Sequence, residues 1–148
     1  MNEKVNFGSR KVLKTKKIKL VSNIFSSVSN KYDLMNDAMS FGLHRLWKER
    51  MYTVSKLKNS DNVLDLATGT GDIALKFLSK KKLISITCLD ENQEMLDICK
   101  NRLTDNGFVK DIKFIKSSAE TSNFKDNSYT LATIAFGFRN FTDHLKSL

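Results

Sequence analysis

The sequence has no proline, only two cysteines and no apolar run close to the roughly 20 residues of a membrane-spanning helix. The cysteines, Cys88 and Cys99, lack the spacing of metal ligands, so we expect reduced core thiols and no bound metal. The first 19 residues hold a single acid, Glu3, and no apolar segment of the length that a signal peptide needs. The sequence therefore argues against a membrane span, a disulfide scaffold and a zinc module.

Positive charge, by contrast, is abundant. The 148 residues carry a formal net charge of +9, and 41% of them are hydrophobic, which suits one folded domain. A basic balance is typical of proteins that bind nucleic acid, an anionic membrane or an anionic ligand, and equally of a solvated lysine-rich surface. The sequence shows no nucleic-acid module and no interleaved aromatic patch, so we expect no nucleic-acid partner.

The N-terminal part divides into two regions. Residues 1–19 are dense in lysine and predict a basic arm that is mobile or loosely docked. Residues 20–58 predict a helical lid or substrate region, with amphipathic helices at 20–30 and 43–57. The second helix is expected to place four apolar residues inward, namely Leu46, Trp47, Met51 and Val54.

Residues 59–148 alternate between short apolar runs and amphipathic segments. The predicted strands cover 62–66, 84–89, 112–115 and 129–136, and the predicted helices cover 71–80 and 91–103. This alternation predicts an α/β domain with a parallel sheet and right-handed crossovers.

The segment NVLDLATGTGDIA, at 62–74, organises this domain. A buried strand runs into a turn of small residues and then into a helix that Asp72 opens or caps. The glycines match the dinucleotide fingerprint, but a pyrophosphate would be repelled by the carboxylate of Asp65 just before them. A cation would be attracted there. The pattern therefore favours S-adenosylmethionine, which has a sulfonium and no phosphate, over a nicotinamide cofactor; a tight turn without a ligand is the third reading.

Two further segments end predicted strands at the same edge of the sheet. Asp90 is placed to accept the ribose hydroxyls of a bound nucleoside, or alternatively to cap the helix that follows. Ser118-Ala119-Glu120 is placed where an adenine ring would lie, with the Ala119 amide and the Ser118 hydroxyl as contacts. An ordinary polar turn explains that segment equally well.

Residues 135–140, AFGFRN, combine two aromatic rings, a guanidinium and an amide at the end of the fourth strand. This mixture suits a flat, partly polar aromatic substrate, although core packing explains the phenylalanines as well. The absence of proline excludes the Pro-Pro-aromatic motif of many enzymes that methylate exocyclic amines. In the lid region, Asp33 and His44 are candidate bases, and helix capping or packing explains each nearly as well.

Four segments together resemble the ubiquinone/menaquinone biosynthesis C-methyltransferase family, over nearly the whole chain. They are KYDLMNDAMSFGLHRLWK at 31–48, VLDLATGTGD at 63–72, SAE at 118–120 and AFGFRN at 135–140. The resemblance implies a Rossmann-like class I methyltransferase fold with strand order 3-2-1-4, an N-terminal helical lid and further C-terminal strands that this sequence lacks. It also implies methylation of a ring carbon of a polyprenyl benzoquinol or of demethylmenaquinol.

The resemblance extends to particular residues. Carried over by motif, Thr70, Asp90, Ser118, Ala119 and Ala135 would line the donor site, beside Asp65, Gly69 and Gly71 of the turn. Independently of the motifs, we expect Arg139 and Asn140 to steady an oxyanion on the quinol, with Asp33 and His44 as weaker candidates for the base.

The expected partner is a lipid-soluble quinol, with peripheral membrane contact and either a homodimer or a biosynthetic complex left open. We expect a cytoplasmic protein, peripheral to the inner membrane, with the mitochondrial matrix as the alternative location. Two other functions remain open: an inactive, truncated methyltransferase-like binding domain and a nicotinamide-dependent dehydrogenase.

Overall fold

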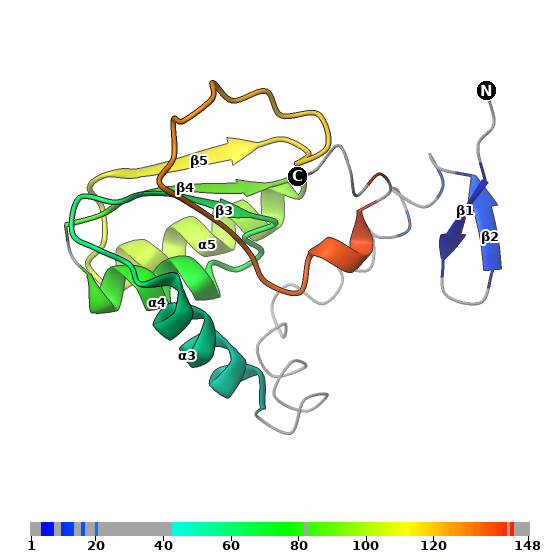
Figure 1. The fold of residues 1–148 in the computed structure, drawn as a ribbon. Helices are drawn as coiled ribbons and strands as arrows, with labels where there is room; N and C mark the ends of the chain where they lie inside the picture. Colours follow the sequence, from blue (N-terminus) through cyan, green and yellow to red (C-terminus); the bar gives the residue numbers. More distant parts are fainter. Residues whose placement is uncertain are drawn as a thin grey trace.

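The computed structural model describes residues 4–7, 10–13, 16, 20, 43–81, 83–141 and 143. Its main feature is a parallel sheet with the strand order β5-β4-β3-β6 (Figure 1). The strands are β3 (Asn62–Leu66), β4 (Ser85–Asp90), β5 (Ile112–Lys116) and β6 (Leu131–Ile134). In chain order this is 3-2-1-4, so the predicted sheet and its connectivity are confirmed.

Two helices cover one face of this sheet. Helix α4 (Asp72–Lys80) joins β3 to β4, and helix α5 (Gln93–Asp105) joins β4 to β5 (Figure 1). Both crossovers run in the same direction along the sheet, so both helices fall on the same face. Residues 117–130, which hold no helix or strand, return the chain to β6.

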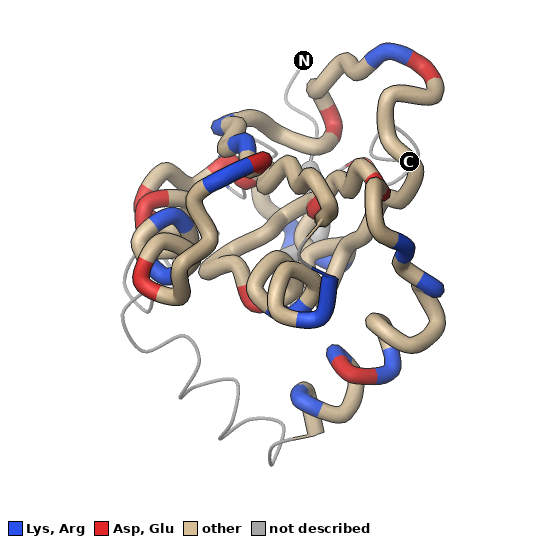
Figure 2. The backbone as a smooth tube through the Cα atoms, turned by 90° about the vertical axis from the view of Figure 1, so that its left-hand side faces the viewer, with Lys and Arg blue, Asp and Glu red and all other residues tan. Residues whose placement is uncertain are grey.

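The alternation of side chains along the strands divides the core in two. Val63, Ile86 and Cys88 pack with the apolar sides of α4 and α5 in the larger cluster. Leu64 and Leu89 belong to a second cluster that includes Ala119 of the return segment. Strand β3 is buried along its centre, as its apolar run predicts. Acidic and basic residues are interspersed along α3, α4 and α5 (Figure 2).

The N-terminal arm differs from the prediction. Strands β1 (Lys4–Phe7) and β2 (Arg10–Leu13) pair antiparallel in a small separate sheet, with Val5 opposite Val12. Polar and apolar residues alternate in β1 (KVNF), a period of two that the high lysine content obscured, but they do not alternate in β2 (RKVL). The predicted helix at 20–30, apart from Leu20, and Asp33 lie outside the described residues.

Helix α3 (Leu43–Ser55) confirms the second predicted helix, but its inward face was predicted wrongly. Leu46, Trp47 and Val54 are 65%, 50% and 56% exposed, and of the four predicted residues only Met51 packs against the core. Ion pairs from Lys48 to Asp72 and from Glu49 to Lys76 tie α3 to α4. The rotation of α3 therefore follows its charges more than its apolar residues.

The turn between β3 and α4 requires a glycine at position 71, for its backbone conformation and for its close approach to Cys99. Gly71 has a φ of +82° and precedes the helix as its N-cap, a conformation that glycine adopts without strain. A Cβ added at Gly71 would overlap the Cys99 sulfur, closer than real Cβ atoms approach. Cys99 and Cys88 are buried free thiols, as expected, and their mutual hydrogen bond together with burial raises the pKa of the Cys88 thiol.

We expect Gly71→Ala to lower the free energy of unfolding by at least about 3 kcal/mol, because left-handed strain and overpacking add. Gly107→Ala is the matched control, since Gly107 has the same φ of +82° but open space around its Cα. The control should lose only about 1–2 kcal/mol. Urea denaturation measures both values, and equal losses would show that contact with Cys99 has no part in the requirement for glycine.

Candidate functional site

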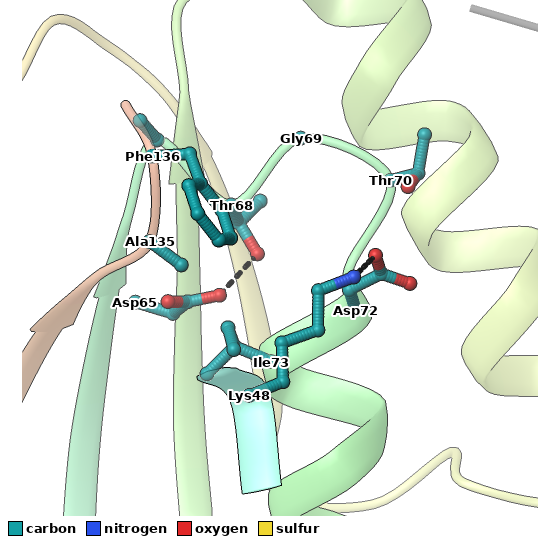
Figure 3. Close-up of a pocket in the computed structure, with 10 residues that line it drawn as sticks. Lys48, Asp65, Thr68, Gly69, Thr70, Asp72, Ile73, Ala135 and Phe136 are labelled. Carbon is teal, nitrogen blue, oxygen red and sulfur yellow. Dashed lines mark hydrogen bonds and ion pairs between the residues drawn. The ribbon is translucent and has the colours of Figure 1, made fainter. Parts of the chain in front are cut away.

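A shallow cleft lies where β3 and β6 end, at the carboxyl edge of the sheet. Figure 3 shows the side chains that surround it. The lining residues are Lys48, Asp65, Ala67, Thr68, Gly69, Thr70, Asp72, Ile73, Ala135 and Phe136. The cleft therefore takes its walls from α3, from the glycine turn and from the end of the fourth strand of the sheet.

Asp65 lies at the base of the cleft and is 1% exposed. Its two carboxylate oxygens accept hydrogen bonds from the hydroxyls of Thr68, at 2.6 Å, and Thr133, at 2.9 Å. Burial raises the pKa of Asp65 to about 6, because the two hydroxyl groups only partly replace water. The acid that the sequence placed before the glycines is thus a buried, weakened acid beside a cleft.

Asp90, the last residue of β4, binds the glycine turn through its carboxylate. Its Oδ2 accepts the Gly69 amide at 2.8 Å, and its Oδ1 accepts the Asn92 amide at 2.9 Å. Burial raises the pKa of Asp90 despite these bonds. Asn92, whose side chain accepts the amides of Glu94 and Met95, caps helix α5. The alternative reading of Asp90 as that cap is therefore wrong.

Asp72, the first residue of α4, forms ion pairs with two basic side chains. Lys48 of α3 pairs with its Oδ2, and Arg102 of α5 pairs with its Oδ1 at 2.6 Å. Burial acts to raise the pKa of Asp72, but the two cations outweigh it and hold the pKa below its usual value. Arg102 also donates to the Thr70 hydroxyl at 3.5 Å. Three helices therefore meet at one carboxylate on the rim of the cleft.

The far wall of the cleft is a strained turn. Phe136 has a φ of +61° and Ala67 a φ of +51°, both in the left-handed region that side chains disfavour. The Phe136 ring lies 5.6 Å from that of Trp47 on α3, measured between centroids. A Cβ added at Gly137 would lie 2.5 Å from the Ala67 Cβ, so the two turns touch where no larger residue fits.

The structure brings four of the predicted donor residues into this one cleft: Asp65, Gly69, Thr70 and Ala135. Gly71 and Asp90 flank the same turn. Ser118 and Ala119 follow β5, whose last residues are joined to β4 by the bond from the Ser117 amide to the Asp90 carbonyl at 3.1 Å. They do not line the cleft.

The predicted catalytic residues are more scattered. Arg139 is exposed and Asn140 half-buried on the short 3-10 helix η2 (Phe138–Asn140), directly after the cleft wall. His44 is buried on α3, one helical turn before Lys48. Neither His44 nor the two η2 residues line the cleft, and Asp33 lies outside the described part of the chain.

Sequence reasoning missed Lys48 and Thr68 and gave Asp72 only a capping role. Lys48 enters the cleft because α3 packs across α4, a tertiary contact that no local pattern reveals. For Thr68 a signal existed: its hydroxyl is three residues beyond Asp65, within reach of that carboxylate across the turn.

The parallel sheet with this order, and an acid-flanked glycine turn at its carboxyl edge, define a Rossmann-like class I methyltransferase fold. Solved structures with such a fold resemble the chain. A putative S-adenosylmethionine-dependent methyltransferase from Methanococcus maripaludis matches with a TM-score of 0.66 and 16% identity, over 80% of this chain and 53% of that chain. The YcgJ protein from Bacillus gives 0.61 and 24%, over 68% and 42%.

The chain belongs to the ubiE/COQ5 methyltransferase family, whose profile matches residues 10–148. A relative named ubiquinone/menaquinone biosynthesis C-methyltransferase UbiE, from Rickettsia prowazekii, is 50% identical over 97% of this chain and 59% of its own length. The protein of the same name from Francisella tularensis is 44% identical over 99% and 59%. The chain thus spans about three-fifths of the length of these relatives.

The buried Asp65 makes stability depend on pH. Between about pH 4 and 6 the folded chain keeps a proton on Asp65 that the unfolded chain has released, so stability falls as the pH rises through this window. A rise from 3.8 to about 6 corresponds to about 3 kcal/mol. Asp65→Asn should make this slope shallower, leaving the smaller part that Asp90 contributes, whereas Asp126→Asn, at an exposed loop position, should leave the slope unchanged. Urea titrations across the window measure the slope, and identical slopes in wild type and Asp65→Asn would contradict the assignment.

Proposed function

We propose that the protein containing this chain transfers a methyl group from S-adenosylmethionine to a ring carbon of a polyprenyl benzoquinol or of demethylmenaquinol. One observation carries the proposal: the Asp90 carboxylate accepts the amide of Gly69, which fixes an acid and a glycine turn together at the carboxyl edge of the sheet. Family membership and the names of the curated relatives support the reaction class.

The residues present fit the donor. An added Cβ at Gly69 would meet no protein atom within 4 Å, so this glycine borders open space in which a ligand can lie against the backbone. Asp90 keeps free lone pairs for ribose hydroxyls beyond the two amides it already accepts. Asp65 places in the cleft a carboxylate that has no cationic partner among the described residues, which suits a sulfonium or an ammonium. Related folds from Thiobacillus denitrificans and Geobacter sulfurreducens were crystallised with S-adenosylhomocysteine.

When bound, the donor supplies a methyl group on a positively charged sulfur. The chain's own contribution is to orient the reactants and exclude water around them. Phe136, whose ring lies tilted against that of Trp47, provides an apolar wall on which a quinol ring can pack. Arg139 and Asn140 follow that wall within four residues and are proposed to steady negative charge on a quinol oxygen. His44 and Asp33 stay candidates for the base.

The other readings receive less support. A nicotinamide cofactor would bring a pyrophosphate next to Asp65 and Asp72, and the cleft offers one basic side chain against these two acids. A non-catalytic binding domain would keep the same donor pocket without the transfer step.

No helix in the described part of the chain is long and apolar enough to cross a membrane. We propose that the lipid-soluble quinol is reached by peripheral contact with a membrane.

Donor binding tests the proposal directly. We expect calorimetry to detect S-adenosylhomocysteine binding and no NADH binding. Asp90→Asn should weaken the first by about 10- to 100-fold, because hydrogen bonds to a charged group contribute about 1.5–3 kcal/mol. Asp97→Asn is the matched control, since Asp97 is an exposed acid on α5 whose contact is with Gln93. Equal affinities of the two variants would remove Asp90 from the donor site.

The substrate is tested by incubating the protein with methyl-labelled donor and each of the two quinols. Mass spectrometry should find the label on a ring carbon, and the preferred quinol identifies the pathway branch. Arg139→Ala should slow transfer by about 100-fold or more without changing donor affinity, as expected for the loss of an oxyanion partner. Arg50→Ala, an exposed change on α3, serves as control. Label on neither quinol would contradict the proposed substrate class.

A further inference from the structure

Several backbone amides of the glycine turn already have partners within the protein. The Thr68 amide donates to the Leu89 carbonyl at 3.0 Å, and the Gly71 amide donates to the Thr68 carbonyl at 3.0 Å. The Gly69 amide is taken by Asp90. Three amides of the turn are therefore satisfied within the protein, which leaves a ligand carboxylate fewer backbone donors there.

Lys48 is the basic side chain among the residues that line the cleft. Although α3 is largely exposed on its outer side, the Lys48 side chain is only 13% exposed and points across the cleft rim toward Asp72 (Figure 3). The other charged lining residues, Asp65 and Asp72, are both acids. A zwitterionic ligand would therefore find its positive groups matched by carboxylates and its negative group matched by Lys48.

The ion pair with Asp72 does not use all the hydrogen-bond donors of the Lys48 ammonium. Lys48 bonds Oδ2 of Asp72, whereas Arg102 bonds the other oxygen, Oδ1, at 2.6 Å. Asp72 therefore keeps a cationic partner if Lys48 turns part of its donor capacity to a ligand. An ammonium has three donors, so Lys48 can bond Asp72 and a ligand carboxylate at the same time.

We propose that Lys48 binds the carboxylate of the amino-acid end of the methyl donor, and so ties helix α3 to the bound donor. This inference rests on the proposed function and adds a contact from outside the α/β domain. Since α3 also carries Trp47 against Phe136, a donor held by Lys48 fixes the aromatic wall of the cleft as well. Donor binding and the placement of α3 are then coupled.

The test uses two ligands that differ only in the carboxylate: S-adenosylhomocysteine and its decarboxylated analogue, S-adenosyl-3-thiopropylamine. In the full chain, Lys48→Met should weaken the first by about 10- to 100-fold, the range for a charge-assisted hydrogen bond. It should change the affinity for the analogue less than about two-fold on the same reasoning. Lys48→Arg should restore most of the preference for the carboxylate. Calorimetry gives each affinity.

Lys76→Met is the matched control, because Lys76 pairs with Glu49 between the same two helices but outside the cleft. It should leave both affinities unchanged. If Lys48→Met lowers the affinity for both ligands equally, Lys48 only holds α3 in place. If it lowers neither affinity, Lys48 does not contact the donor. Either result overturns the inference. If Lys48→Met does not fold, Lys48→Gln, which keeps a donor toward Asp72, replaces it. Wild-type protein that binds neither ligand contradicts the proposed function itself.

Discussion

The hydrogen bond from the Gly69 amide to Asp90 Oδ2, at 2.8 Å, joins the ends of two neighbouring strands across the turn on which the site depends. Beside it the Thr68 amide bonds the Leu89 carbonyl. The turn after β3 is therefore fastened to the end of β4 by both a side chain and the backbone. A glycine at position 69 can approach this carboxylate closely while its other side stays open to the cleft.

Three acids lie around this turn, and each is stabilised by a different chemistry. Hydroxyl groups serve Asp65, backbone amides serve Asp90, and two cations serve Asp72. The directions of their pKa shifts follow from these partners. Burial raises the pKa of Asp65 and Asp90, whose hydrogen-bond donors are neutral, whereas two cations lower the pKa of Asp72 despite its burial. A cation entering the cleft meets the Asp65 carboxylate, which neutral groups compensate only partly, and this is an electrostatic setting that suits a sulfonium donor.

How much the sequence predicts depends on the range of the interactions. The strands, α4, α5 and the position of Asp65 follow from local periodicity and from the glycine turn, and all are found, with element bounds that differ from the predicted ones by up to two residues. The cap of α5 was assigned to Asp90 as an alternative, since the two-residue difference from Asn92 lies below what a pattern resolves. The inward face of α3 was missed because Lys48 and Glu49 pair with residues of α4, contacts that periodicity cannot anticipate.

The strained turns on the far side of the cleft show why small residues recur at this edge of the sheet. Ala67 stands in a left-handed conformation, and its methyl group occupies the space beside Gly137 that a Cβ there would need. Phe136, whose backbone is also in the left-handed region, contacts the Trp47 ring. Strain of about 1–3 kcal/mol at each such residue persists only where the surrounding structure enforces it. The close approach of Ala67 and Gly137 therefore holds the two turns together at the edge of the cleft that Ala67 and Phe136 line.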